Sequence, residues 1–111
     1  MTVEDLIEKG IFQVAVEGED LSREVTGIFC CDLLSVAMGR APSDSAWVTV
    51  MGNVNTIAVA TLADVACVIL AEGAQPDDVC RSRASQQGVT VLATEEPVFE
   101  AALKVHGLLH G

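Results

Sequence analysis

The feature that most constrains the fold is an unbroken apolar run at residues 66–71. It lies between Asp64 on one side and Glu72 and Gly73 on the other. A strand with one face in solvent alternates apolar and polar residues, whereas a run without alternation is typical of a strand covered on both faces. Strands of that kind belong to parallel sheets flanked by helices, so this run predicts an α/β fold.

Strand and helix patterns alternate along the rest of the chain. Extended patterns predict further strands at residues 11–16, 25–30, 47–51 and 89–93. Helices are predicted from Thr2 to a stop at Gly10, from Asp32 to Gly39, from 56 to 63 behind Asn55 as N-cap, from Pro76 to Gly88, and from Pro97 onward. We therefore expect one domain over residues 1–111, a three-layer α/β/α fold with a largely parallel sheet of about five strands.

The charge balance excludes two classes of partner. Six basic residues stand against sixteen acidic ones, a net charge of −10. The basic residues do not cluster, so the chain has no basic surface that could bind a nucleic acid or an anionic membrane. Residues 1–10 contain Glu4, Asp5 and Glu8 in place of the basic start of a secretory signal, which predicts a cytoplasmic protein.

The cysteines leave two interpretations open. They are Cys30, Cys31, Cys67 and Cys80, and no pair has the two-residue spacing of a zinc or thioredoxin-type motif. In a reducing compartment such thiols are expected to fill a core as small hydrophobic groups. A redox or iron–sulfur role is the alternative.

The carboxyl ends of the predicted strands carry the candidate site, because ligands of open parallel sheets bind beyond those ends. The candidate ligand-binding residues are Gly52, Asn53, Asn55, Thr56, Asp32, Glu72 and Gly73. Residues 52–56 are the best of them, since the amides at a helix start can hold a small anion. Asn53 and Asn55 are explained about equally well as turn and cap residues.

Other chemistry-bearing residues do not form a recognisable set. Asp32 and Glu72 are either paired carboxylates or, more simply, a helix cap and a loop residue. His106 and His110 have metal-chelating spacing but lie at the chain end without a third ligand, so we expect a frayed terminus there and no metal. Trp47 is expected in the core or at a subunit interface. No catalytic residue and no cofactor are predicted.

The order of short motifs along the chain resembles a DRTGG domain from Thr2 to Leu109. The motifs are Val25-Thr26-Gly27, Cys31-Asp32-Leu33-Leu34-Ser35, Met38-Gly39, Trp47-Val48-Thr49, Asn55 before Ile57-Ala58-Val59-Ala60, and Ile69-Leu70-Ala71-Glu72-Gly73 with Pro76. The chain is most similar to the stand-alone type, which is related to the amino-terminal domain of HPr kinase. Where the family's name motif would stand, this chain has Gly52-Asn53-Val54-Asn55-Thr56, without its Asp, Arg and paired Gly.

The resemblance implies an α/β regulatory domain, commonly dimeric, found alone or joined to CBS, phosphotransacetylase or kinase modules. It does not imply kinase activity, because the chain has no Gly-x4-Gly-Lys-Ser/Thr phosphate-binding loop. We therefore predict a non-catalytic regulatory or interaction domain, a homodimer that binds a partner protein or a small anionic or nucleotide-like ligand. The alternatives are a redox or iron–sulfur accessory protein of hydrogenase-type systems and a small enzyme whose site assembles across a dimer.

Overall fold

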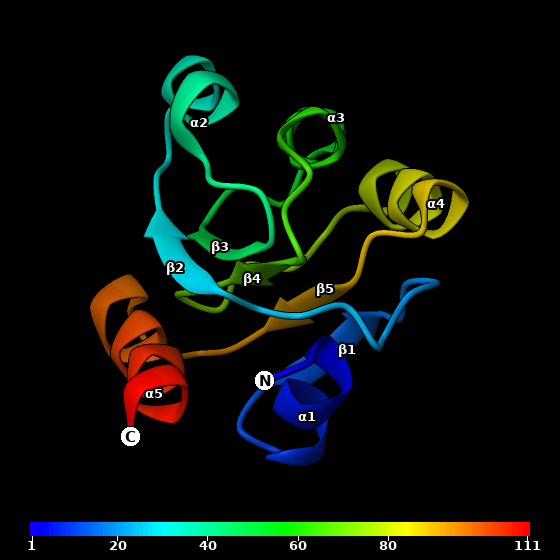
Figure 1. The fold of residues 1–111 in the computed structure, drawn as a ribbon. Helices are drawn as coiled ribbons and strands as arrows, with labels where there is room; N and C mark the ends of the chain where they lie inside the picture. The colour runs from blue at the N-terminus through cyan, green and yellow to red at the C-terminus, as the bar shows by residue number, and fades with distance from the viewer.

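Five strands form one sheet in the order β1-β5-β4-β3-β2 in the computed structural model, which describes residues 1–111 (Figure 1). The strands are β1 (Gln13–Val16), β2 (Gly27–Cys30), β3 (Ser45–Thr49), β4 (Cys67–Leu70) and β5 (Val91–Ala93). Strands β2, β3, β4 and β5 run parallel, and β1 pairs antiparallel with β5. The predicted α/β fold with a largely parallel sheet is confirmed.

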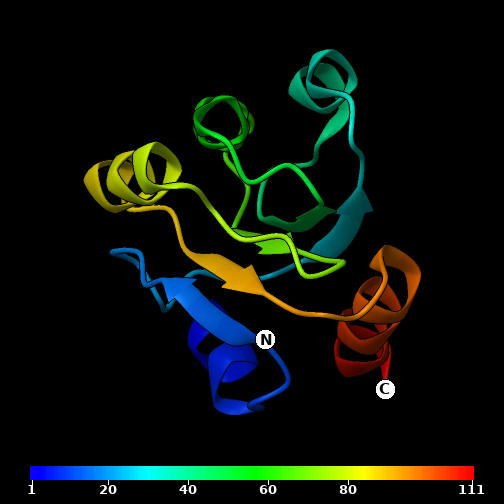
Figure 2. The same ribbon diagram turned by 180° about the vertical axis from the view of Figure 1, so that it is seen from behind.

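The helices cover both faces of the sheet, which gives three layers. They are α1 (Val3–Glu8), α2 (Leu34–Arg40), α3 (Val54–Ala63), α4 (Asp78–Gln87) and α5 (Val98–His110). Figure 1 and the reverse view in Figure 2 show α2, α3 and α4 on one face and α1 and α5 on the other. The crossovers through α2, α3 and α4 all advance by one strand in the same direction, so the uniform hand of such connections puts these helices on the same side.

Each face of the sheet has its own hydrophobic core. Cys67 and Ile69 of β4 pack into the core under α1 and α5, together with Ala101 and Val105. Val68 and Leu70 pack into the core under α2, α3 and α4, together with Trp47. Every residue of β4 is therefore buried, as the unbroken apolar run predicted. None of the helices is long and apolar enough to cross a lipid bilayer.

Several helix ends follow the predicted local chemistry. The Asp5 amide donates to the Thr2 hydroxyl at 3.1 Å and the Thr2 amide donates to the Asp5 carboxylate at 2.9 Å, a capping box that begins α1. Helix α4 begins at Asp78, two residues after the predicted start at Pro76, because the Asp77 carboxylate caps it by accepting from the Cys80 amide at 2.8 Å. Gly88, with φ 72°, ends α4 in the left-handed conformation that glycine adopts without strain.

Two predicted caps and one predicted stop are wrong. The N-cap of α3 is Asn53, and Asn55 lies inside the first turn of a helix that begins at Val54. The N-cap of α2 is Leu33, whose aliphatic side chain cannot accept a hydrogen bond. The carboxylate of Asp32, the predicted cap, accepts instead from the Thr49 hydroxyl on the neighbouring strand. Gly39 is inside α2, and the helix ends when Ala41 becomes extended before a proline.

The outer surfaces of α3 and α5 also differ from the sequence-based expectation. The helical spacing of Val98, Phe99, Ala102 and Leu103 predicts one buried apolar face on the last helix. In α5, however, Phe99 and Leu103 are 68% and 54% exposed, whereas Ala101 and Val105 are buried. Residues 56–63 are apolar almost all round, which is typical of a buried helix, yet Leu62 of α3 is 71% exposed. The chain end is not frayed, because α5 continues through Gly107 as far as His110.

Candidate functional site

Asp32 joins the end of β2 to the end of β3. One oxygen of its carboxylate accepts from the Thr49 hydroxyl at 2.7 Å and from the Val50 amide at 3.0 Å. Asp32 is an exposed residue, yet that oxygen is bonded to the molecule's own loop. The arrangement fixes the path of the chain as it leaves two neighbouring strands.

The stretch from Gly52 to Thr56 forms the start of α3, and its side chains have different roles. The Asn53 side chain accepts from the Asn55 amide at 3.0 Å and from the Thr56 amide at 3.3 Å. Thr56 is buried, and its hydroxyl donates to the Met51 carbonyl at 2.8 Å. Asn55 is exposed on the first turn of the helix. The Asn55 side chain makes no hydrogen bond within the molecule, whereas Asn53 and Thr56 both use a side-chain oxygen in this way.

Glu72 and Gly73 lie where the connections of two neighbouring strands turn to opposite faces, β4 toward α4 and β5 toward α5. Such a switch point is where open α/β sheets usually form a ligand crevice. Here the two loops are bonded together, because the Glu72 amide donates to the Glu96 carbonyl at 2.8 Å and the Gly73 amide to the Thr94 carbonyl at 3.0 Å. These two hydrogen bonds hold the loops together, and neither Glu72 nor Gly73 lines a surface hollow.

The Glu72 carboxylate supports the closing helix. It accepts from the Val98 amide at 3.3 Å, at the first residue of α5, where Pro97 supplies no side-chain cap. A carboxylate at this position also interacts favourably with the helix dipole. Asp32 and Glu72 therefore bond to different loops, and they follow strands that have β3 between them. The structure does not bring them together as an acid–base pair.

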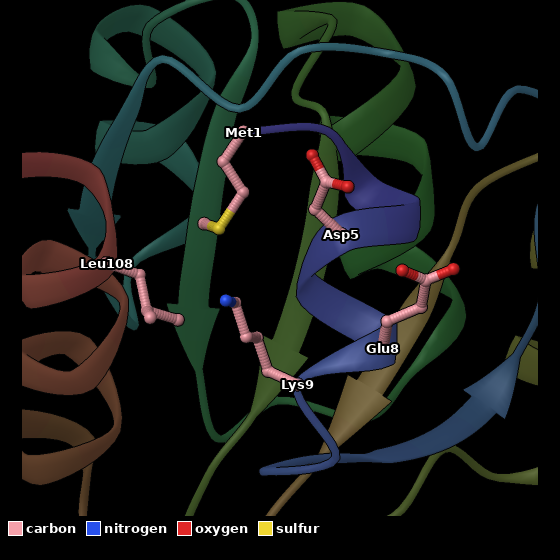
Figure 3. Close-up of a pocket in the computed structure, with 5 residues that line it drawn as sticks. All are labelled: Met1, Asp5, Glu8, Lys9 and Leu108. Carbon is pink, nitrogen blue, oxygen red and sulfur yellow. The ribbon is translucent and has the colours of Figure 1, made fainter.

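None of the surface hollows is lined by a candidate site residue. The largest, of about 420 Å³, lies between α1 and the end of α5 (Figure 3). The side chains of Met1, Lys9 and Leu108 converge across it, and Asp5 and Glu8 line the α1 side. No pattern in the sequence predicts this groove, because its walls come from opposite ends of the chain.

The cysteines are divided between the two faces of the sheet. Cys67 is in the core under α1 and α5, and Cys80 is in the core under α2, α3 and α4. Burial raises the pKa of Cys67 to about 12, and burial followed by the charge of Asp77 raises the pKa of Cys80. At the end of β2, burial and Asp32 raise the pKa of the Cys30 thiol. No group of three or more His, Cys, Asp or Glu side chains is placed to hold a metal ion.

His106 and Trp47 were also singled out from the sequence. The rings of His106 and His110 are 4.3 Å apart between centroids on the exposed surface of α5, without a third ligand. Trp47 is fully buried and donates its indole N–H to the Cys31 carbonyl at 3.0 Å. Trp47 is therefore a core residue that also holds the end of β2.

The carboxylates and hydroxyls at this sheet edge are thus bonded within the loops of one three-layer α/β domain. The model of the DRTGG domain matches residues 11–108, which is nearly the whole chain. This chain belongs to the DRTGG domain family, a family of regulatory domains. Among curated proteins, no similar sequence was found.

Proposed function

We propose that this chain is a non-catalytic regulatory or interaction module, one domain over residues 1–111, which works in the cytoplasm as a homodimer. The observation that carries the proposal is the use of the reactive side chains at the sheet edge. Asp32, Thr56 and Glu72 are each bonded to backbone or side-chain groups of the molecule itself. An enzyme would need such groups aimed at a substrate, whereas a binding module needs only a shaped surface.

The ligand we propose for this module is a small anion or a nucleotide-like molecule at the start of α3. Residues 45–63 contain no charged side chain, although the whole chain carries a net charge of −10. The partial positive charge of the helix N-terminus is therefore not opposed by an acidic residue within that stretch. Asn55 is exposed there and offers an amide donor.

Nuclear magnetic resonance titration of the full chain tests this assignment. We expect inorganic phosphate, AMP or ATP to shift the amide signals of residues 52–56. Asn55→Asp places a negative charge at the site and should raise the dissociation constant roughly threefold or more. The matched control is Gln86→Glu on the exposed surface of α4, which should leave it unchanged. Shifts that are absent, or that Asn55→Asp does not weaken, contradict the ligand site.

The alternative, a redox or iron–sulfur accessory role, has to rest on Cys30 and Cys31, because Cys67 and Cys80 are buried on opposite faces of the sheet. Native mass spectrometry of protein purified without air distinguishes the two functions. The regulatory module has the mass of the chain, or of its dimer, without iron and sulfide. A mass excess of iron and sulfide that Cys30→Ser removes would establish the alternative.

A further inference from the structure

Strand β2 ends the sheet with one edge unpaired. Its single neighbour in the sheet is β3. The Cys31 amide donates to the Val48 carbonyl on β3 at 3.3 Å. Because amides along a strand point alternately to its two sides, those of Ile28 and Cys30 face outward. An open edge of this kind is a template for another strand, and proteins normally protect it.

The opposite edge of the sheet shows such protection. Strand β1 has a register shift between Val14 and Val16, and the Arg81 guanidinium donates to the Ala15 carbonyl at 3.0 Å. Acidic residues follow directly at Glu17 and Glu19. Bulges and charges are devices that prevent a strand from pairing with another chain. Strand β2 has neither a bulge nor a charged residue.

Exposed apolar side chains stand on both sides of β2. In Figure 1, β2 lies at one side of the molecule between α2 and α5. Phe99 and Leu103 project from α5, and Leu33, Val36 and Met38 are exposed at α2. A hollow of about 200 Å³ between β2 and α5 is lined by Ile28, Phe99, Ala102, Leu103 and His106. We call β2 with these exposed residues of α2 and α5 the β2 face.

The charge distribution indicates what covers the β2 face. Residues 25–43 carry one acidic and one basic side chain, Asp32 and Arg40, and are neutral in a chain of net charge −10. On α5 the nearby charges are Glu100 and Lys104, which also cancel. A second copy is repelled by most of this acidic molecule but not by this surface. A surface without net charge also has no electrostatic attraction for a charged partner.

We propose that the β2 face binds a second copy of this chain. The two β2 strands pair antiparallel about a two-fold axis, so that one sheet continues through both subunits, and α2 and α5 pack across the interface. A two-fold axis makes the interface self-complementary, as the same apolar patch then covers itself. This inference rests on the homodimer of the proposed function and identifies the surface that forms it.

Sedimentation equilibrium of the full chain and of single variants tests the surface. We expect a dimer, twice the 11.6 kDa chain mass, and a dissociation constant raised about tenfold or more in Phe99→Glu and in Leu103→Glu. The matched controls are Leu62→Glu on α3 and Val79→Glu on α4, which are as exposed but lie away from the β2 face. They should change the constant less than about twofold.

Hydrogen exchange of the unmodified chain tests the strand pairing without any substitution. The amides of Ile28 and Cys30 should exchange more slowly as the protein concentration rises through the dissociation constant. A monomer at about 0.1 mM overturns both the inference and the homodimer of the proposed function. A dimer broken by Leu62→Glu or Val79→Glu but not by the α5 variants, or one that leaves both amides unprotected, overturns the β2 face alone.

Discussion

Gly52 is the residue at which the loops after β3 and β4 touch. A Cβ atom at this position would lie 2.9 Å from the carbonyl carbon of Gln75 and closer still to its oxygen. The Asp77 amide donates to the Gly52 carbonyl at 3.0 Å, so the two loops are also bonded. Because the obstacle is backbone, relief requires one loop to move. The position of the α3 start therefore depends on the absence of a side chain at residue 52.

We expect Gly52→Ala to destabilise the protein by about 1–3 kcal/mol, the usual cost of forcing a methyl group into a packed site. Gly39→Ala is the matched control, since residue 39 is inside α2 and no atom lies within 4 Å of its added Cβ. That substitution should stabilise the protein by about 0.5–1 kcal/mol, because alanine favours a helix. Urea unfolding measures both. Equal effects of the two substitutions would contradict the close contact.

The Cys67 thiol links stability to alkaline pH. Its pKa is raised from 9.0 to about 12 because the thiolate would be buried in the core. Between these values the unfolded chain loses the proton while the folded protein keeps it. The free energy of unfolding must then fall as pH rises through this range, by at most about 1.4 kcal/mol per pH unit from this group.

Cys67→Ala should make that fall shallower. The measurement is the free energy of unfolding in urea at pH 8, 9 and 10 with a reducing agent present. The slopes are compared, because loss of the sulfur atom also lowers stability at every pH. Cys31→Ala, at a partly exposed position, serves as control and should retain the full slope. An unchanged slope in Cys67→Ala would show that the thiol ionises in the folded protein.

At the scale of the elements, α3 shows how one residue decides where a helix begins. Asn53 and Asn55 are both asparagines, and either is a good N-cap by residue type. In the structure Asn53 has the extended conformation of a cap and accepts two amides, whereas the Asn55 amide is one of those donors.

Asn53→Ala should therefore lower the free energy of unfolding by about 1 kcal/mol, the typical value of a lost N-cap. Asn55→Ala should change it by less than about 0.5 kcal/mol, because the residue is exposed and within the helix. Thermal unfolding of the two variants beside the unmodified chain gives the comparison. A larger loss of stability in Asn55→Ala than in Asn53→Ala would identify Asn55 as the cap.

The sequence predicted those elements whose signals are local. The apolar run of β4, the helix start at Thr2 and the Gly88 stop each depend on neighbours in the chain, and each was confirmed. The buried face of α5 could not be predicted in this way. Phe99 and Leu103 fit a helical apolar stripe with Ala102, yet the sheet ends at β2 and leaves them uncovered.

The candidate site follows the same division. The alternation of strands and helices in the sequence predicted a parallel sheet, and the candidate site was placed at the carboxyl ends of its strands for that reason. The roles of Asp32 and Glu72 did not, because their partners are Thr49 with Val50 in one case and Val98 in the other, distant in sequence. Contacts between loops depend on the order of the strands in the sheet, so residue spacing along the chain cannot predict them.

At the scale of the whole molecule, the two cores are joined through the strands. Along β3, Ala46 and Val48 pack under α1 and α5, whereas Trp47 packs under α2, α3 and α4. A strand cannot leave one core without disturbing the other. Both faces should therefore unfold in one cooperative step, as small domains usually do.

Val105→Ala tests this coupling, because Val105 is buried on α5 and Trp47 lies in the core on the other side of the sheet. Loss of two buried methyl groups should cost roughly 2 kcal/mol. In urea, Trp47 fluorescence and far-ultraviolet circular dichroism should both shift to the same lower midpoint. Val79→Ala, exposed on α4, should shift neither. If the dichroism transition moves while the Trp47 transition stays in place, the faces unfold separately and the shared strands do not couple them.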